Sequence, residues 1–445
     1  MKTTGRITLK SAWYFALVAS ICFEGLGRKF LPMIPSAAFY YLKDFVLLLG
    51  YFFFPRPAYI SKVNIWLYRG FKLIWMVGLF WTVVELFNPE QTSTILAAIG
   101  IRAYWLWWAA PPIIANILND DQEKRRAIYV LLGAAALVSV FAAVQFVLPT
   151  DSAFSIYSVV EGEEIGPTIV YSTGRSRVSS TFSYITGFSN FTVLVPTLIL
   201  ALGLDAREPR LRKIAFVVTC MTAAVVPMAG ARSSILLGLA VLVISAWSAG
   251  LLVTRIGRRI LMGGIAAGVL AVVLFPEAFI GVQSRFADEE ETQSRYVMAA
   301  TTVLPPLALA TFKYPPLGLG TGMQQNARLP LKIPVKMEEE AEVGRYLIEL
   351  GPVGFLLIWS AKLGLVVALL RAYRILKRAG RQGAAAAALS YAFLTLIGNL
   401  VFDHIWQALY FLGCGSILAE VVSVLRARAA AAEAPPVAAS KALAA

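Results

Sequence analysis

The chain has 445 residues, of which 58% are hydrophobic and 15% are charged, and its mean hydropathy is +0.70. A soluble domain has about 45–50% apolar and about 25% charged residues, so this composition excludes a soluble globular protein and predicts an integral membrane protein. The formal net charge of +14 does not indicate nucleic-acid binding. Its basic residues come in short clusters between hydrophobic segments, which is how membrane topology is encoded.

Hydrophobic segments are spread along the whole chain. A bilayer core of about 30 Å needs about 20 mostly apolar helical residues. Twelve candidate segments meet or approach this length: 11–23, 37–54, 72–87, 93–118, 127–148, 186–204, 214–228, 233–252, 260–280, 346–370, 384–401 and 405–424. The sequence therefore predicts an all-α polytopic membrane protein with a single transmembrane domain over residues 1–428. The tail from 429 to 445, rich in alanine and proline, is predicted to be disordered.

Basic clusters in the connections predict the orientation. With the N-terminus in the cytoplasm, they all fall on one side: "EKRR" at 123–126, "REPRLRK" at 207–213, "RIGRR" at 255–259, "RAYRILKRAGRQ" at 371–382 and "RAR" at 426–428. By the positive-inside rule this side is the cytoplasm, so we expect both termini of the chain in the cytoplasm. Two long segments, about 149–185 and 281–345, then face the periplasm, and loops of this length usually carry function.

Several cations break this pattern, because they are expected at the outer ends of the segments. They are Arg232 in "AGARSSILLGL", Arg102 in "AAIGIRAYWLWW", Lys43 beside Asp44 in "YYLKDFVLLLG", Arg28, Lys29, and Arg175, Arg177, Arg285, Arg295 and Arg345 in or near the loops. An arginine at the bilayer centre costs about 2.5–3.5 kcal/mol on insertion scales. Lys43 and Asp44 can form a local pair, and Arg28 and Lys29 can reach lipid headgroups.

For Arg177, Arg232 and Arg295 a functional interpretation is favoured. The acids of the outer side are concentrated in two runs, 288–291 and 338–342, so few other carboxylates can neutralise these arginines. A guanidinium group bonds two oxygens at once and therefore suits phosphate. The sequence predicts an anionic ligand that is reached from the outer leaflet.

A catalyst that acts on a hydroxyl also needs a base. The stretch "KMEEEAEVGRYLIELGPVGF" places Glu340 and Glu342 at the start of the tenth segment, with Glu342 and Arg345 on one helix face. Acids at a helix N-terminus also complement its dipole, so this structural alternative stays open. The same holds for His404, the only histidine, which lies beside Asp403.

Some motifs of other enzyme classes are absent from the sequence. It contains no Asp-x-Asp pair, no Gly-Lys-Ser/Thr phosphate loop and no Cys/His cluster. Nucleotide-sugar transferases that bind a divalent metal typically carry the first, and ATP-driven enzymes the second. We therefore predict no metal and no cofactor.

Five stretches together resemble one family. They are "YLKD" at 41–44, "RVSSTFSYITGFSNF" at 177–191, "AGARSSILLGL" at 229–239, "SRYVMAATTVLPPLALATFKYPPLGLGTG" at 294–322 and "RYLIELGPVGFLLI" at 345–358. The pattern is similar to the bacterial O-antigen polymerase and O-antigen ligase superfamily, and most similar to its exopolysaccharide polymerases. Ligases carry His-Asn just before the tenth span, whereas this chain has Glu340 or Glu342 there.

The resemblance implies a multi-span, C-type glycosyltransferase with a polyprenyl-pyrophosphate-linked glycan as donor and no metal. A polymerase passes this glycan to a lipid-linked repeat unit, and a ligase passes it to lipid A-core. The resemblance implies pyrophosphate contacts for Arg177, Arg232 and Arg295. As hypotheses of our own, Glu342 accepts a proton from the acceptor hydroxyl, and Arg345 fixes the carboxylate or a phosphate. Arg102, Lys43 and Asp44 are predicted to bind the substrate. A flippase and a chain-length regulator are the implied protein partners.

Two alternatives to the polymerase remain. One is the O-antigen ligase, against which the missing His-Asn weighs. The other is a transporter of an anionic lipid or sugar that uses the same arginines without chemistry. A flippase must expose its site to both leaflets, whereas the exceptional cations here are all expected on one side.

Overall fold

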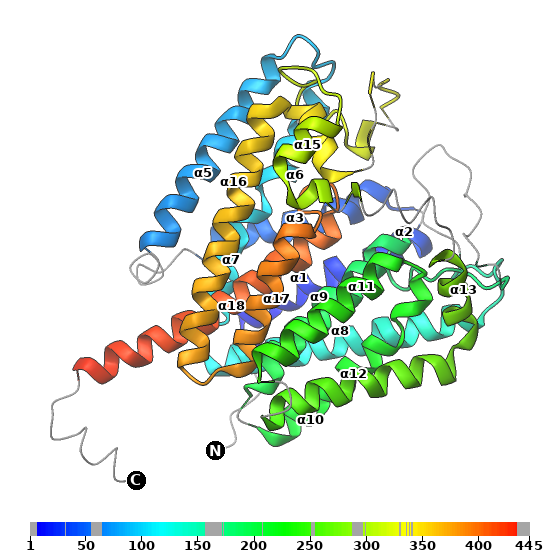
Figure 1. Ribbon diagram of the computed structural model, residues 1–445, viewed down its shortest axis with the longest axis vertical. Coiled ribbons are helices and arrows are strands. Elements are labelled where there is room, and N and C mark those ends of the chain that lie inside the picture. The colour runs from blue at the N-terminus through cyan, green and yellow to red at the C-terminus, as the bar shows by residue number, and fades with distance from the viewer. Residues whose placement is uncertain are drawn as a thin grey trace.

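The computed structural model describes residues 7–31, 33–54, 65–155, 171, 173–206, 208–250, 254–286, 297–298, 300–328, 331–334, 336–337, 339 and 341–433. Arg295, Glu340 and the acidic run 288–291 lie outside these residues. The described part of the chain is all-helical, as predicted (Figure 1).

The hydrophobic runs of the sequence form its helices. The α-helices are α1 (Leu9–Cys22), α2 (Glu24–Phe30), α3 (Ser36–Phe53), α5 (Ile65–Val84), α6 (Thr94–Trp105), α7 (Ala110–Ile117), α8 (Asp121–Val147), α9 (Ile185–Leu204), α10 (Pro209–Ala224), α11 (Arg232–Ser248), α12 (Arg255–Leu274), α13 (Pro276–Phe286), α15 (Pro305–Thr311), α16 (Glu342–Arg378), α17 (Gln382–Ile397) and α18 (His404–Glu433). Short 3₁₀ helices include η2 (Trp107–Ala109) and η3 (Val226–Ala229).

Within the described residues, seven helices are long and apolar enough to cross a membrane, or eight if α1 and α2 form one bent span. α11 and α17 are also apolar but shorter. The chain is thus a polytopic membrane protein, as predicted, while the count of twelve spans stays a prediction. α18 continues through Arg428 to Glu433, into the segment predicted as the tail.

Three of the predicted segments are interrupted in the structure. The first bends by 60° between α1 and α2. The fourth, predicted over 93–118, is divided by η2 into α6 and α7. The tenth begins at Glu342 and breaks at Gly351 inside α16. Each interruption lies close to residues that carry charge.

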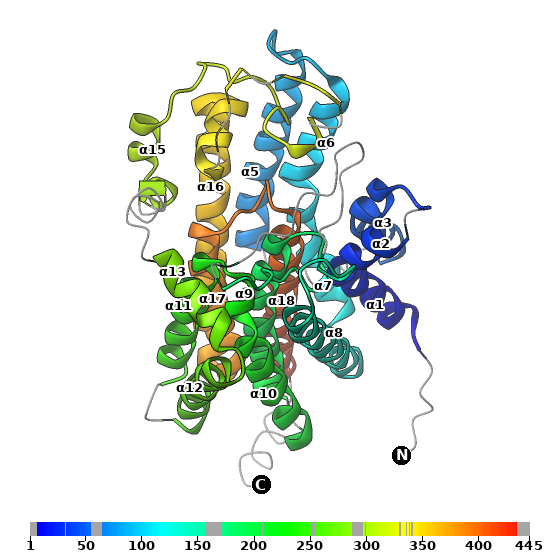
Figure 2. The ribbon, with the colours of Figure 1, turned by 90° about the vertical axis from the view of Figure 1, so that its right-hand side faces the viewer.

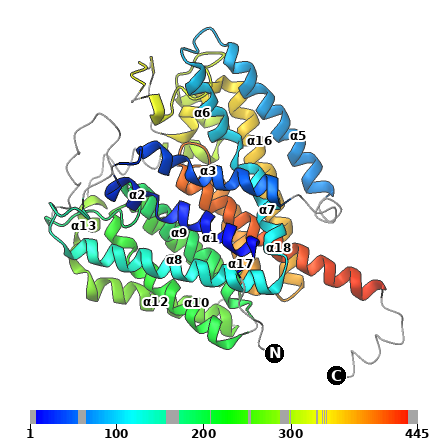
Figure 3. The ribbon, with the colours of Figure 1, turned by 180° about the vertical axis from the view of Figure 1, so that it is seen from behind.

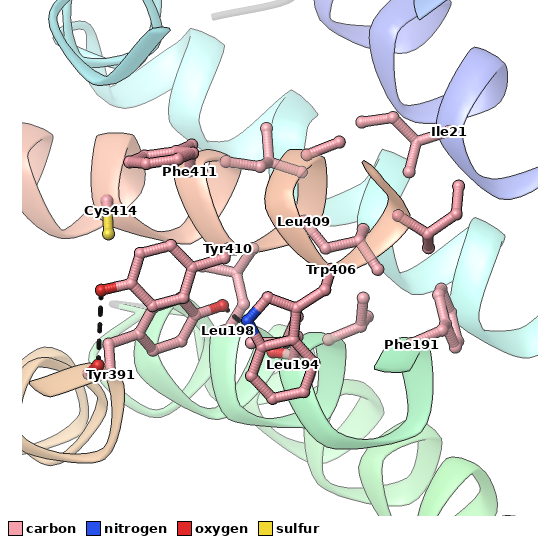
Figure 4. Packing of buried hydrophobic residues seen from close by; sticks show 14 of the residues in the cluster. Ile21, Phe191, Leu194, Leu198, Tyr391, Trp406, Leu409, Tyr410, Phe411 and Cys414 are labelled. Carbon is pink, nitrogen blue, oxygen red and sulfur yellow. Dashed lines mark hydrogen bonds between the residues drawn. The ribbon is translucent and has the colours of Figure 1, made fainter. Parts of the chain in front are cut away.

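α9 and α18 form the centre of the molecule. Their apolar stretches are mostly buried, whereas those of α3 and α12 are mostly exposed, as expected for helices that face lipid. α18 packs against α7, α9, α16 and α17. Figure 4 shows its Trp406, Leu409 and Tyr410 packed toward Leu194 and Leu198 of α9. This core positions the first residue of α18, His404.

The remaining helices surround this centre. α1 packs against α3 and α8, and α12 packs against α10 and α11. Seen from behind, α1, α3 and α7 lie in front of α18 (Figure 3). α5 and α16 pack together, and their upper parts extend with α6 beyond the level of α9–α13 (Figure 2).

The break in α16 exposes backbone carbonyls that other segments satisfy. Gly351 has a φ of +63° and a ψ of −176°, and Pro352 follows it. Proline has no N–H to continue the helical ladder. The freed carbonyls accept hydrogen bonds as follows: Ile348 from the N–H of Leu319 (2.7 Å), Glu349 from that of Gly320 (3.0 Å) and Leu350 from Trp81 Nε1 (3.2 Å). Such compensation is what a broken membrane helix requires.

We expect Gly351→Ala to destabilise the protein by about 1–3 kcal/mol, because this backbone conformation is essentially restricted to glycine. The added Cβ would also lie 2.7 Å from the carbonyl oxygen of Pro316. Thermal unfolding of the detergent-purified protein measures the change. Gly133→Ala in α8 is the matched control, since no atom lies within 4 Å of its added Cβ. Equal unfolding temperatures for both variants would contradict the expectation.

Candidate functional site

Arg177 lies against η3, directly before α11. Its Nε donates a hydrogen bond to the carbonyl oxygen of Ala229 (3.0 Å). Gly230 follows with a φ of +63°, and a Cβ at this position would lie 2.7 Å from Arg177 Nε. Glycine is therefore needed both for the turn and for the approach of the arginine. Arg232 begins α11 two residues later. We refer to Arg177 and Arg232 as the arginine site.

An apolar groove lies between α9, α10, α11 and α12, with a cavity volume of about 320 Å³. Gly238 and Gly268 line it, and both have open space where a side chain would stand. Pro227 of η3 and Ile235, one turn along α11 from Arg232, also line it. One end of the groove therefore lies beside the arginine site.

Arg28 and Lys29, at the end of α2, contact the segment that follows Arg177. Arg28 Nη1 donates to Ser183 Oγ (3.0 Å), and Lys29 Nζ donates to Ser179 Oγ (2.9 Å). Among the described residues, the side-chain partners of both cations are serine hydroxyls. The sequence analysis allowed both cations to reach lipid headgroups, and in the structure they bond to the segment that Arg177 begins.

Lys43 and Asp44 are adjacent in sequence, but each pairs with a residue from another helix. Lys43 Nζ lies 2.6 Å from Glu24 Oε2, and both side chains are almost completely buried. Arg102 Nη2 lies 2.5 Å from Asp44 Oδ2, and Trp107 Nε1 donates to Asp44 Oδ1 (2.7 Å). Glu24, Lys43, Asp44 and Arg102 form what we call the ion-pair cluster. It joins α2, α3 and α6.

His404 borders the ion-pair cluster. Its Nδ1 is 2.8 Å from Tyr40 Oη, and the two rings meet edge to face with centroids 4.2 Å apart. The Arg102 guanidinium lies 5.1 Å from the centre of the same tyrosine ring. The three candidates Lys43, Asp44 and Arg102 are thus brought together with the histidine.

Asp403 does not orient the imidazole of His404. Its Oδ1 accepts the N–H groups of Ile405 and Trp406, so it caps α18, and its Oδ2 accepts from Asn190. Burial raises the pKa of Asp403, although these hydrogen bonds oppose the effect. The carboxylate therefore fixes the start of α18.

Glu342 lies apart from these groups and is enclosed by donors. Its carboxylate accepts from Tyr346 Oη and from the N–H of Leu400 (2.6 Å), and Lys362 Nζ lies 3.2 Å away. The break at Gly351 turns Lys362 back toward the start of its own helix. The cation paired with Glu342 is thus Lys362.

Arg345 has different partners from those that the sequence suggested. Its Nε donates to the carbonyl oxygen of Glu339 (2.6 Å), and its guanidinium lies 5.3 Å from the centre of the Phe402 ring. It therefore tethers the residues that precede α16 to the turn before α18.

Glu349 organises the glycine-rich stretch 318–322. It is fully buried and accepts hydrogen bonds from Tyr104 Oη (2.8 Å) and from the N–H of Gln324. Sequence analysis did not single out Glu349, nor Glu24 and Lys362. All three are ionisable residues inside apolar runs, and that signal could have identified them.

Comparisons with known proteins neither support nor contradict these assignments. No protein-family model matches the chain, and no curated protein matches it. Within the described part of the chain, no group of three His, Cys, Asp or Glu side chains could hold a metal ion. The interpretation of the site therefore rests on its geometry and chemistry.

We expect Lys362→Met to destabilise the protein by about 3–5 kcal/mol, because it leaves the Glu342 carboxylate buried without its cation. The double variant Glu342→Gln/Lys362→Met should recover much of this loss, since both charges are removed. Thermal unfolding of the two single variants and the double variant gives the coupling energy. Strictly additive effects would show that the pair does not hold the two parts of α16 together.

Proposed function

We propose that this chain is a polysaccharide polymerase of the bacterial inner membrane, with both termini in the cytoplasm. In this proposal it is a C-type glycosyltransferase that works at the periplasmic face. The donor is a glycan linked to polyprenyl pyrophosphate, and the acceptor is a lipid-linked repeat unit. The proposed reaction uses no metal or cofactor.

The observation that carries this proposal is the position of the apolar groove beside the arginine site. A polyprenyl pyrophosphate has two unlike parts, an apolar chain and an anionic headgroup. The groove between α9 and α12 offers apolar surface to the chain. Arg177 and Arg232 offer guanidinium groups to the phosphates, with which they form charge-assisted hydrogen bonds.

The chemistry needs positive charge where the donor bond breaks. As the bond between the anomeric carbon and the pyrophosphate oxygen breaks, its electron pair leaves with the pyrophosphate. Arginines held in place by η3 and α11 stabilise this developing charge without rearranging. Arg28 and Lys29 lie beside the same segment and add to the positive field.

We expect Arg232→Ala and Arg177→Ala each to lower polymer formation by roughly 100- to 1,000-fold, the usual cost of removing one group that stabilises a departing charge. The measurement is the size distribution of lipid-linked glycans in a deletion strain complemented with each variant. Arg175→Ala is the matched control, because Arg175 lies on the same segment but pairs with Glu277. It should retain wild-type chain lengths.

The deletion strain distinguishes the alternative functions. Single repeat units that accumulate on the carrier support the polymerase. Long chains that still form on the carrier overturn it. If such long chains form but are missing from lipid A-core, the protein is a ligase. If they form but stay inside the cell, the protein is a transporter.

We expect Gly238→Leu to raise the KM for the lipid-linked donor about tenfold, the equivalent of about 1.4 kcal/mol. The leucine would extend into the groove, where nothing lies within 4 Å of the added Cβ. Turnover by the purified protein at varied donor concentration measures the effect. Gly133→Leu, on the exposed face of α8 away from the groove, should keep the wild-type KM. Equal KM values for both variants would exclude the groove as the tail site.

A further inference from the structure

A base is needed at the proposed reaction centre, and the surroundings of Glu342 do not favour it. Its carboxylate accepts from Tyr346 and from the backbone of Leu400, and Lys362 neutralises it. These donors occupy the oxygen lone pairs that a base would offer to a hydroxyl proton. These contacts assign Glu342 to holding the broken α16 together.

His404 has the opposite surroundings. Only its Nδ1 is bonded, to Tyr40, and among the described residues no hydrogen bond reaches Nε2. The residue is only partly buried. In the tautomer that carries its proton on Nδ1, the ring donates to Tyr40 Oη and leaves the Nε2 lone pair available. An imidazole nitrogen with an available lone pair can accept the proton of a hydroxyl group, which is the task of a general base.

One short segment joins the arginine site to the ion-pair cluster beside His404. Arg177 begins this segment, and six residues later Ser183 bonds to Arg28 (3.0 Å) and to Glu24 (3.3 Å). Six extended residues span at most about 20 Å. The segment also contains a turn between Ser179 and Phe182, which shortens it. The segment therefore runs from the arginine site to Glu24 of the ion-pair cluster, which His404 borders.

We propose that His404 is the base that accepts the proton of the acceptor hydroxyl, an assignment that rests on the proposed polymerase function. In this step the acceptor oxygen forms a bond to the anomeric carbon of the donor. The bond from that carbon to pyrophosphate breaks, and its electron pair leaves with the pyrophosphate. The hydroxyl proton moves to Nε2 of His404.

Charged groups face His404 from several helices. Arg28 is on α2, Lys43 on α3 and Arg102 on α6, and all three act on the ring through their charge. Glu24 and Asp44 neutralise Lys43 and Arg102, and Asp403 precedes the ring in sequence. Of the three cations, Arg28 is the one whose side-chain partners among the described residues are hydroxyls and not carboxylates, so it contributes most to attracting an anionic donor.

The test uses the full-length protein in liposomes with a lipid-linked repeat unit as substrate. For the wild type we expect the rate at saturating substrate to rise with pH as the base loses its proton. His404→Gln should lower this rate by about 100-fold or more and remove the pH dependence, with the donor KM unchanged. Tyr40→Phe should lower the rate about tenfold, because the ring loses the partner that orients it.

Tyr41→Phe is the matched control for Tyr40→Phe, since its ring lies next to Arg102 but its hydroxyl makes no hydrogen bond to His404. It should keep the wild-type rate. Wild-type turnover and pH dependence in His404→Gln would overturn the base assignment while leaving the polymerase in place. If His404→Gln does not fold, equal rates for the two tyrosine variants overturn it instead. A wild type that forms no polymer overturns the proposed function itself, and the base assignment with it.

Discussion

Buried charge must be neutralised inside a membrane protein, and this requirement shapes how the helices of the bundle meet. Three of the buried ion pairs among the described residues show how this requirement is satisfied: Glu24–Lys43, Asp44–Arg102 and Glu342–Lys362. Each pair joins parts of the chain that are not continuous helix, namely α2 with α3, α3 with α6, and the two parts of α16. Removing one partner of such a pair leaves an uncompensated charge and is strongly destabilising. The pairs therefore decide how the surrounding helices meet.

The breaks in the helices follow from the same requirement. An unbroken α16 would carry Glu342 and Lys362 about 30 Å apart along its axis, and the turn at Gly351 brings them together. The break would expose carbonyl groups to an apolar environment, but the glycine-rich stretch 318–322 supplies N–H groups to them. The buried Glu349 carboxylate in turn holds that stretch. Charge pairing and backbone pairing thus support one another.

The positions of the helices could be predicted from the sequence, because a membrane span needs a long apolar run. The interruptions could not be predicted in the same way, although the Gly351-Pro352 pair is a recognisable breaker. The partners of the buried charged residues were even harder to predict from the sequence. Because Lys43 and Asp44 are adjacent in the sequence, a local ion pair between them is a plausible prediction. Adjacent residues of a helix, however, point in different directions. Their true partners, Glu24 and Arg102, are fixed by how the helices pack, which periodicity does not encode.

The cations fall into two groups: those that form ion pairs within the fold, and those whose partners leave them able to bind an anionic ligand. Lys43 and Arg102 are held by carboxylates, so they contribute little net charge to the site. Arg28 and Lys29 bond to serine hydroxyls and not to carboxylates. Both cations contact the segment that Arg177 begins. Arg177 in turn contacts η3, which lines one end of the apolar groove. A lipid whose chain occupies the groove would carry its headgroup onto this segment, and a sugar beyond the headgroup would extend toward His404. In the proposed transfer the acceptor oxygen must approach the anomeric carbon to about 3–3.5 Å, so both substrates would have to meet along the segment that runs from the arginine site to the ion-pair cluster beside His404.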